Sequence, residues 1–315
     1  MQKKRIGYID ILKAICIIGI MAAHITVCVP AANSGIIGQV FPSLGFGCGV
    51  QGFFIASGFF FSTKRPFNAG KELRHTMLPY AVSCVIIIVA GTAINQALYP
   101  TGDWTATATK WTAASVYMSG SLTYPMLWPS WIQLIMIGGL WFLPAMFWGK
   151  LFIAIIRKIP TPRALRGRYK EELIPVLLIL ALFLISYITI STLKLPFAIQ
   201  PGMGTAFWMY LGLLIRKFGL FDDGRIAKPI WVVLLLVWVA GLLLTPGSYP
   251  DDCEYPHGII DIVVSICGVF CLVAFSKFVE KHLKWPSRAI QAAGRNTLPI
   301  FCSHIIDLDI LLGPV

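Results

Sequence analysis

The sequence predicts an all-α fold, a polytopic transmembrane helical bundle of about nine to ten helices with a cytoplasmic N-terminus. Of 315 residues, 57% are hydrophobic and 13% charged, and the mean hydropathy is +0.75. Soluble domains carry about 45–50% apolar and about 25% charged residues, so a soluble domain is excluded. Runs such as 229–244 and 259–275 are almost entirely apolar. They indicate spanning helices and not the alternating strands of a membrane barrel.

The apolar runs predict nine spans, because a spanning helix needs about 20 residues. The spans cover residues 6–29, 44–62, 78–98, 132–156, 173–193, 203–217, 229–246, 258–276 and 297–313. The segment Trp104–Trp128 is rich in Thr, Ser and Trp and is too polar for a span, so we expect a re-entrant or interfacial helix there. We expect residues 1–315 to form a single transmembrane domain, with a further C-terminal helix to follow in the intact protein.

The basic residues are distributed unevenly, which orients the bundle. The five segments expected inside hold 22 of the 26 Lys and Arg residues; they are 3–5, 64–74, 157–170, 216–228 and 277–295. The outer loops keep Lys110 and Lys194 together with the acidic stretch 251–254. Cytoplasmic loops of membrane proteins retain Lys and Arg, so this asymmetry predicts an inner (cytoplasmic) membrane protein. It also explains the net charge of +12 without nucleic acid as a partner.

Cysteine spacing gives no sign of a metal centre. The chain has eight cysteines but no CxxC pair and no Cys/His cluster of zinc spacing. Most of them fall in apolar segments, where Cys packs as a small hydrophobic side chain. We therefore expect no metal and no disulfide framework.

The first span carries three ionisable side chains, Asp10, Lys13 and His24. At about 100° per residue they share one narrow helix face, with His24 roughly 16 Å beyond Lys13 along the axis. Ionisable groups inside a spanning helix are costly and usually mark function. Two plainer interpretations remain open. Lys13 can extend to the interface with Asp10 as its i,i+3 partner, and His24 can be a buried structural histidine.

Six motifs along nearly the whole chain point to one family. They are Tyr8–Ala14 followed by His24, Gly52–Phe59, Lys71–Arg74 with Leu78–Tyr80, Leu140–Ala145, Met209–Gly212, and Gly294–Leu298 with His304. In this order they resemble the acyltransferase 3 family of membrane-bound O-acyltransferases. The fucose 4-O-acetylase-like branch is the most similar, because it has Lys at the position of Lys13. The sequence departs from the family at Lys71, where Arg is commoner and would offer a bidentate phosphate contact.

The resemblance implies an enzyme that moves an acyl group, commonly acetyl, from cytoplasmic acyl-CoA to a hydroxyl of a cell-surface carbohydrate or its lipid-linked precursor. It implies that His24 is the general base and that Asp10 holds Lys13 or supports the histidine network. It further implies that Lys71 and Arg74, with Lys13 deeper, hold the coenzyme's phosphates.

Ser57 and Trp141 are further candidates for contact with the coenzyme. Close helix packing at Ser57 and interfacial anchoring at Trp141 are the alternatives. For Lys71 and Arg74 the alternative is ordinary anchoring at the inner membrane surface. His304 fits a structural hydrogen-bonding role better than a catalytic one.

Other classes of function also fit the polar stripe that Asp10, Lys13 and His24 form on the first span. A transporter or flippase can use it as a substrate or proton path, although the chain has no internal repeat of the kind typical of transporters. The chain can also be an inactive membrane sensor or anchor, or the membrane half of a larger fusion protein. Besides acyl-CoA and the glycan acceptor, membrane lipids are the expected partners.

The topology gives a first testable prediction. Arg166 lies in the basic segment 157–172, which the asymmetry places in the cytoplasm. An Arg166→Cys variant should react with a membrane-impermeant thiol reagent only after the membrane is opened. The parent protein with its native cysteines is the control. Labelling of the variant in intact cells would contradict the orientation of the whole bundle.

Overall fold

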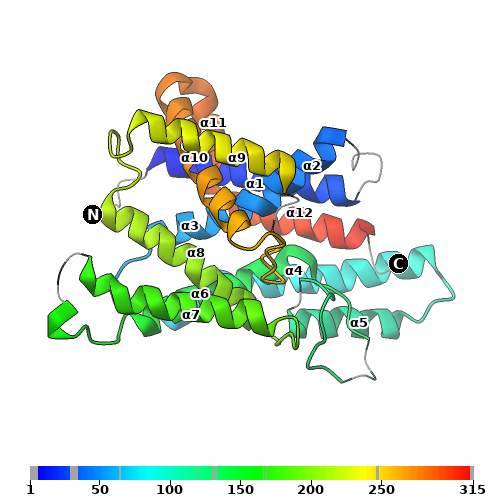
Figure 1. Ribbon diagram of the computed structural model, residues 1–315. Coiled ribbons are helices and arrows are strands. Elements are labelled where there is room, and N and C mark those ends of the chain that lie inside the picture. Colours follow the sequence, from blue (N-terminus) through cyan, green and yellow to red (C-terminus); the bar gives the residue numbers. More distant parts are fainter. Residues whose placement is uncertain are drawn as a thin grey trace. The chain divides into compact units, whose positions relative to one another are not determined.

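A computed structural model describes residues 6–28, 35–63, 65–118, 120–129, 131, 133–165, 167, 169–245 and 248–312 (Figure 1). Throughout these ranges the regular structure is helical and no strand is present, which confirms the all-α prediction. The chain divides into two compact units. Unit 1 comprises Met1–Phe60, Leu211–Pro250 and Glu254–Phe301; unit 2 comprises Phe61–Tyr210, Asp251–Cys253 and Cys302–Val315. The single domain expected over 1–315 stays a prediction.

Unit 1 is built around the first helix. Its elements are α1 (Gly7–Cys28), α2 (Gly35–Leu44), a π-helix (Gly45–Gly49), α3 (Val50–Phe59), α9 (Lys228–Leu244), α10 (Ile259–His282) and α11 (Lys284–Arg295). Helix α1 packs against α2, the π-helix, α3, α10 and α11. Gly45 allows the π-helix to approach α1, because a Cβ there would collide with the carbonyl oxygen of Gly19. Such π segments are frequent at functional sites.

Unit 2 contains α4 (Ala69–Leu98), α5 (Trp104–Tyr117), a 3-10 turn (Gly138–Trp141) that leads into α6 (Phe142–Ile156), and α7 (Leu173–Thr189). Helix α4 packs against α5 and α6, and α6 packs against α7. Two helices contribute to both units, α8 (Ile199–Phe218) and α12 (Thr297–Leu312).

Six helices of the described chain are long and apolar enough to cross a membrane. They are Gly7–Thr26, Val40–Phe59, Ala69–Leu98, Gly138–Ile156, Lys170–Thr189 and Ile259–His282. Each overlaps a predicted span. The remaining predicted spans fall on α8, α9 and α12, of which α9 is apolar but only 17 residues long. The total of nine to ten and the cytoplasmic N-terminus therefore stay predictions. The basic residues at 3–5, 64, 166 and 168 lie outside the described residues.

Two boundaries differ from the prediction for local reasons. Helix α4 begins at Ala69 and not near residue 78, because the side chain of Asn68 accepts a hydrogen bond from the backbone N–H of Lys71 and caps the helix. The polar segment Trp104–Trp128 is helical only as far as Tyr117. Asp103 caps that helix, and hydrogen bonds from Thr105 and the backbone hold the pKa of its carboxyl below the usual value.

Candidate functional site

The polar face of α1 contains an ion pair in direct contact. Lys13 Nζ lies 2.7 Å from Asp10 Oδ1, and the two side chains are 25% and 12% exposed. The i,i+3 pairing expected from the sequence is therefore present. Gly294 of α11 packs directly against the backbone of Asp10, where any Cβ would collide with the carbonyl oxygen. Close packing of this kind fixes the turn of α1 that presents the pair.

His24 lies one turn before the end of α1 and is half-buried. Its ring meets Phe46 of the π-helix edge-on, with the centroids 5.1 Å apart, and Phe46 lies 6.4 Å from the ring of Tyr249. Ser265 of α10 donates a hydrogen bond to the carbonyl oxygen of Gly47, which anchors the π-helix. His24 therefore faces a rigid aromatic neighbour on a distorted helix.

A buried amide lies two residues after the π-helix, and it is not among the residues predicted from the sequence. Gln51 is fully buried in α3, and its Nε2 donates to Ser248 Oγ at 2.7 Å. Its Oε1 is buried without a hydrogen-bond partner among the described residues. A buried amide oxygen without a partner is rare and can accept a hydrogen bond from a hydroxyl group. The sequence signal was a lone Gln inside the apolar span 44–62.

Ser57 also belongs to unit 1. It lies half-buried on α3, two residues after Ile55. Gly212 of α8 packs against the carbonyl oxygen of Ile55, so the lack of a side chain at Gly212 lets α8 approach the backbone of α3.

The remaining predicted residues belong to unit 2. Lys71 and Arg74 lie in the first two turns of α4, exposed, and neither is in an ion pair within the described chain. Glu72, between them in sequence, pairs instead with Lys150 at 2.6 Å. Trp141 is 7% exposed and packs directly against Gly120. A Cβ at Gly120 would collide with the indole ring of Trp141. Lys71 and Arg74 are accessible to a phosphate, whereas Trp141 is mostly enclosed.

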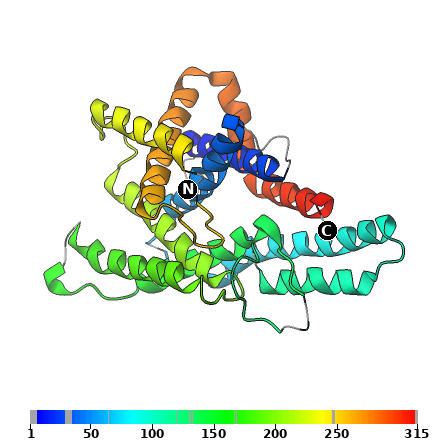
Figure 2. The same ribbon diagram turned by 45° about the vertical axis from the view of Figure 1, so that its right-hand side comes forward.

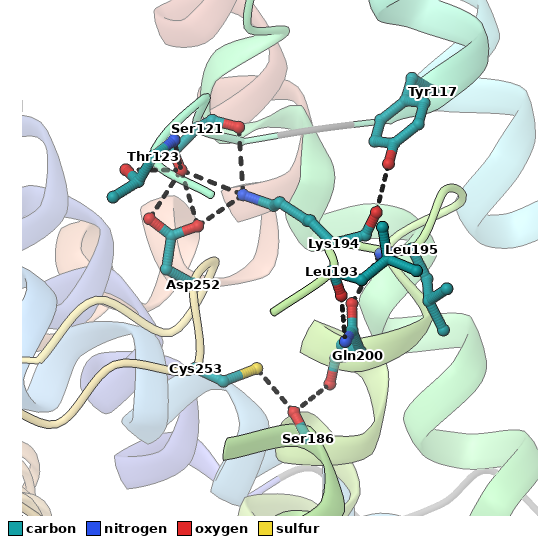
Figure 3. Close-up of polar contacts among 10 residues, drawn as sticks. All are labelled: Tyr117, Ser121, Thr123, Ser186, Leu193, Lys194, Leu195, Gln200, Asp252 and Cys253. Carbon is teal, nitrogen blue, oxygen red and sulfur yellow. Dashed lines mark hydrogen bonds and ion pairs between the residues drawn. The ribbon is translucent and has the colours of Figure 1, made fainter. Parts of the chain in front are cut away.

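A second buried ion pair joins segments that the prediction left as plain outer loops (Figure 3). Lys194 is only 2% exposed, and its Nζ lies 2.5 Å from Asp252 Oδ1. The ammonium also donates to the backbone carbonyl and the hydroxyl of Ser121 at 3.1 and 3.0 Å. The hydroxyl of Ser121 reaches both carboxylate oxygens at 2.6 Å. Lys194 is therefore not an isolated loop lysine.

The neighbours of this pair are shifted in their acidity. Burial and the adjacent carboxylate of Asp252 raise the pKa of Asp251 to about 6. Burial raises the pKa of the Cys253 thiol to about 12, and this thiol lies 2.7 Å from the hydroxyl of Ser186. A thiol that holds its proton this firmly is a poor nucleophile, so Cys253 serves the packing of the segment.

Comparison with known protein families gives a match over nearly the whole chain. A family model described as an acyltransferase domain matches residues 6–312, nearly the whole chain. No curated protein and no solved structure matches the chain.

The Lys194–Asp252 pair gives a stability prediction. Lys194→Met or Asp252→Leu alone leaves an uncompensated buried charge, so each should lower the free energy of unfolding by about 3–5 kcal/mol. The double variant leaves neither charge and should lose much less than the sum. Thermal unfolding of the purified proteins measures the coupling. Lys110→Met, the other lysine expected outside, is the control and should change little. Additive losses in the double variant would contradict a direct pair.

Proposed function

Since the chain belongs to the acyltransferase 3 family, we propose that this multi-pass membrane acyltransferase is an acyl-CoA-dependent O-acyltransferase. Its donor is cytoplasmic acyl-CoA, commonly acetyl-CoA, and its acceptor is a hydroxyl of a cell-surface carbohydrate or a lipid-linked precursor. The polar face of α1 carries the proposal, because it holds a closed Asp10–Lys13 pair and His24 on one helix that packs at the centre of unit 1.

In the proposed reaction, neutral His24 takes the proton of the acceptor hydroxyl as that oxygen attacks the thioester carbonyl. The new C–O bond forms, the C–S bond breaks, and coenzyme A leaves as a thiolate that the histidine can reprotonate. General-base catalysis of this kind is typically worth 10²–10⁴-fold. Phe46 limits the tilt of the imidazole ring, since the two rings are in edge-on contact.

The cations have separate parts in this scheme. Lys71 and Arg74 are exposed and free of ion pairs in the described chain, so they are suited to the coenzyme's phosphates. Lys13 is already paired with Asp10, which fixes the position of its ammonium. Two of its three N–H donors can still face a ligand. Asp10 is thus a positioning residue that acts through Lys13.

His24→Ala tests the chemistry. Turnover should fall by at least about 10²-fold, while coenzyme A binding should persist, because the proposed phosphate contacts lie elsewhere. In the parent protein, acyl transfer should decline as pH falls, since only the neutral imidazole accepts a proton. Acyl-transfer assays and calorimetric titration with coenzyme A measure both effects. His282→Ala, on the exposed end of α10, is the matched control. Near-normal turnover in a folded His24→Ala protein would reject the mechanism and leave transport through the stripe as the better function.

Arg74→Ala tests the coenzyme contact. The Michaelis constant for acyl-CoA should rise more than turnover falls, as expected for binding that is equal in the ground and transition states. Arg74→Lys should recover only part of the affinity, because Lys lacks the bidentate fork. Arg225→Ala removes an exposed arginine from another basic segment and should leave the constant unchanged. An unchanged Michaelis constant in Arg74→Ala would return Arg74 to simple anchoring.

A further inference from the structure

Helix α11 carries a one-sided basic stripe. Its sequence, KWPSRAIQAAGR, contains no acidic residue. At about 100° per residue, Lys284, Arg288 and Arg295 fall within about 40° of one another on the helix surface. All three are exposed, and none forms an ion pair with any described residue. These three residues form the α11 stripe.

The neighbouring face of α11 is fixed to α1. Gly294 packs against the backbone of Asp10, and the amide of Gln291 lies beside Gly7. The two helices therefore run in the same sense, with Arg295 near the level of Asp10. Arg288 lies about 10 Å behind it, at about 1.5 Å per residue, and Lys284 lies further back still. The stripe thus begins ahead of the first residue of α1 and ends near the level of Asp10, on the exposed side of α11.

The stripe begins where the chain leaves the membrane. Helix α10 is long and apolar enough to span, and it ends at His282, two residues before α11 begins (Figures 1 and 2). The side chains at this junction are exposed and apolar: Leu283 is 43% exposed and Trp285 is 81% exposed. Tryptophan is enriched at the membrane–water interface, because its ring has an apolar body and a polar N–H. The first turn of α11 therefore lies at headgroup level.

Nearby acids do not neutralise the stripe. Asp223 pairs with Lys277 at 2.6 Å, and Glu280 of α10 lies against Gly7. Three unbalanced cations beside exposed apolar side chains match a ligand that has a phosphate joined to acyl chains. Polybasic segments at a membrane surface attract anionic lipids, by about 1 kcal/mol for each Lys or Arg.

We propose that the α11 stripe is a binding site for an anionic phospholipid. Its phosphate lies between Lys284 and Arg288, which are one helical turn apart, and its chains lie along Leu283 and Trp285. Arg295 adds positive charge further along the same face. The site does not depend on the acyltransferase reaction proposed above.

Native mass spectrometry of the purified full chain tests the site, with phosphatidylglycerol or phosphatidylcholine added in equal amounts. The parent protein should retain phosphatidylglycerol preferentially. In the combined Lys284→Gln, Arg288→Gln and Arg295→Gln variant, affinity for phosphatidylglycerol should fall about fivefold for each charge removed, while retention of phosphatidylcholine stays the same. The matched control is Lys158→Gln, Arg163→Gln and Lys170→Gln, which removes three exposed charges between α6 and α7. It should keep the preference.

Three outcomes would overturn the site: no preference in the parent protein, an undiminished preference in the stripe variant, or an equal loss in the control. Retained lipid with a raised Michaelis constant for acyl-CoA would assign the stripe to the coenzyme and likewise overturn it. If the triple variant fails to fold, Arg288→Gln alone changes one exposed side chain and should lower the affinity about fivefold.

Discussion

The ion pair between Lys13 and Asp10 is the constraint on which unit 1 depends. A charged group inside an apolar helix is costly, and pairing within one turn of α1 reduces that cost. The pair places a fixed ammonium on the same face as His24, and the packing of α11 through Gly294 keeps the turn in place. The π-helix completes the arrangement by setting Phe46 against the imidazole ring. Local helix geometry thus defines the proposed reaction path.

In unit 2, charged side chains are also paired, but the partners are far apart in the sequence. Lys194 pairs with Asp252, Lys150 with Glu72, and Arg157 meets both carboxylate oxygens of Glu172 at 2.8 and 2.7 Å. Each partner comes from a different segment, so the ion pairs also tie the chain together. Of these pairs, only the Lys194–Asp252 pair is buried at both partners, so removal of one partner there leaves an uncompensated buried charge.

The sequence was informative where the physics is local. The shared face of Asp10, Lys13 and His24 follows from helical periodicity alone, and the structure contains the expected i,i+3 pair. The pairing of Lys194 with Asp252, 58 residues apart, depends on tertiary folding and has no periodic signal. Asn68 is a typical helix-capping residue and could have predicted that α4 begins at Ala69. It was not used, because it lies outside the apolar run that defined the span. The division into two units could not be predicted, because two of its boundaries fall inside the helices α8 and α12. The sequence has no Gly-, Pro- or Ser-rich linker at those points.

The central claim is that acyl transfer takes place along the polar face of α1. The most direct test of this claim is photolabelling with an acyl-CoA analogue that carries its reactive group on the acyl chain. Peptide mapping by mass spectrometry then locates the labelled residues. Labelling should fall on the part of α1 that contains His24, and excess acetyl-CoA should suppress it. Labelling confined to peptides of residues 61–210, or labelling that acetyl-CoA does not suppress, would contradict the claim.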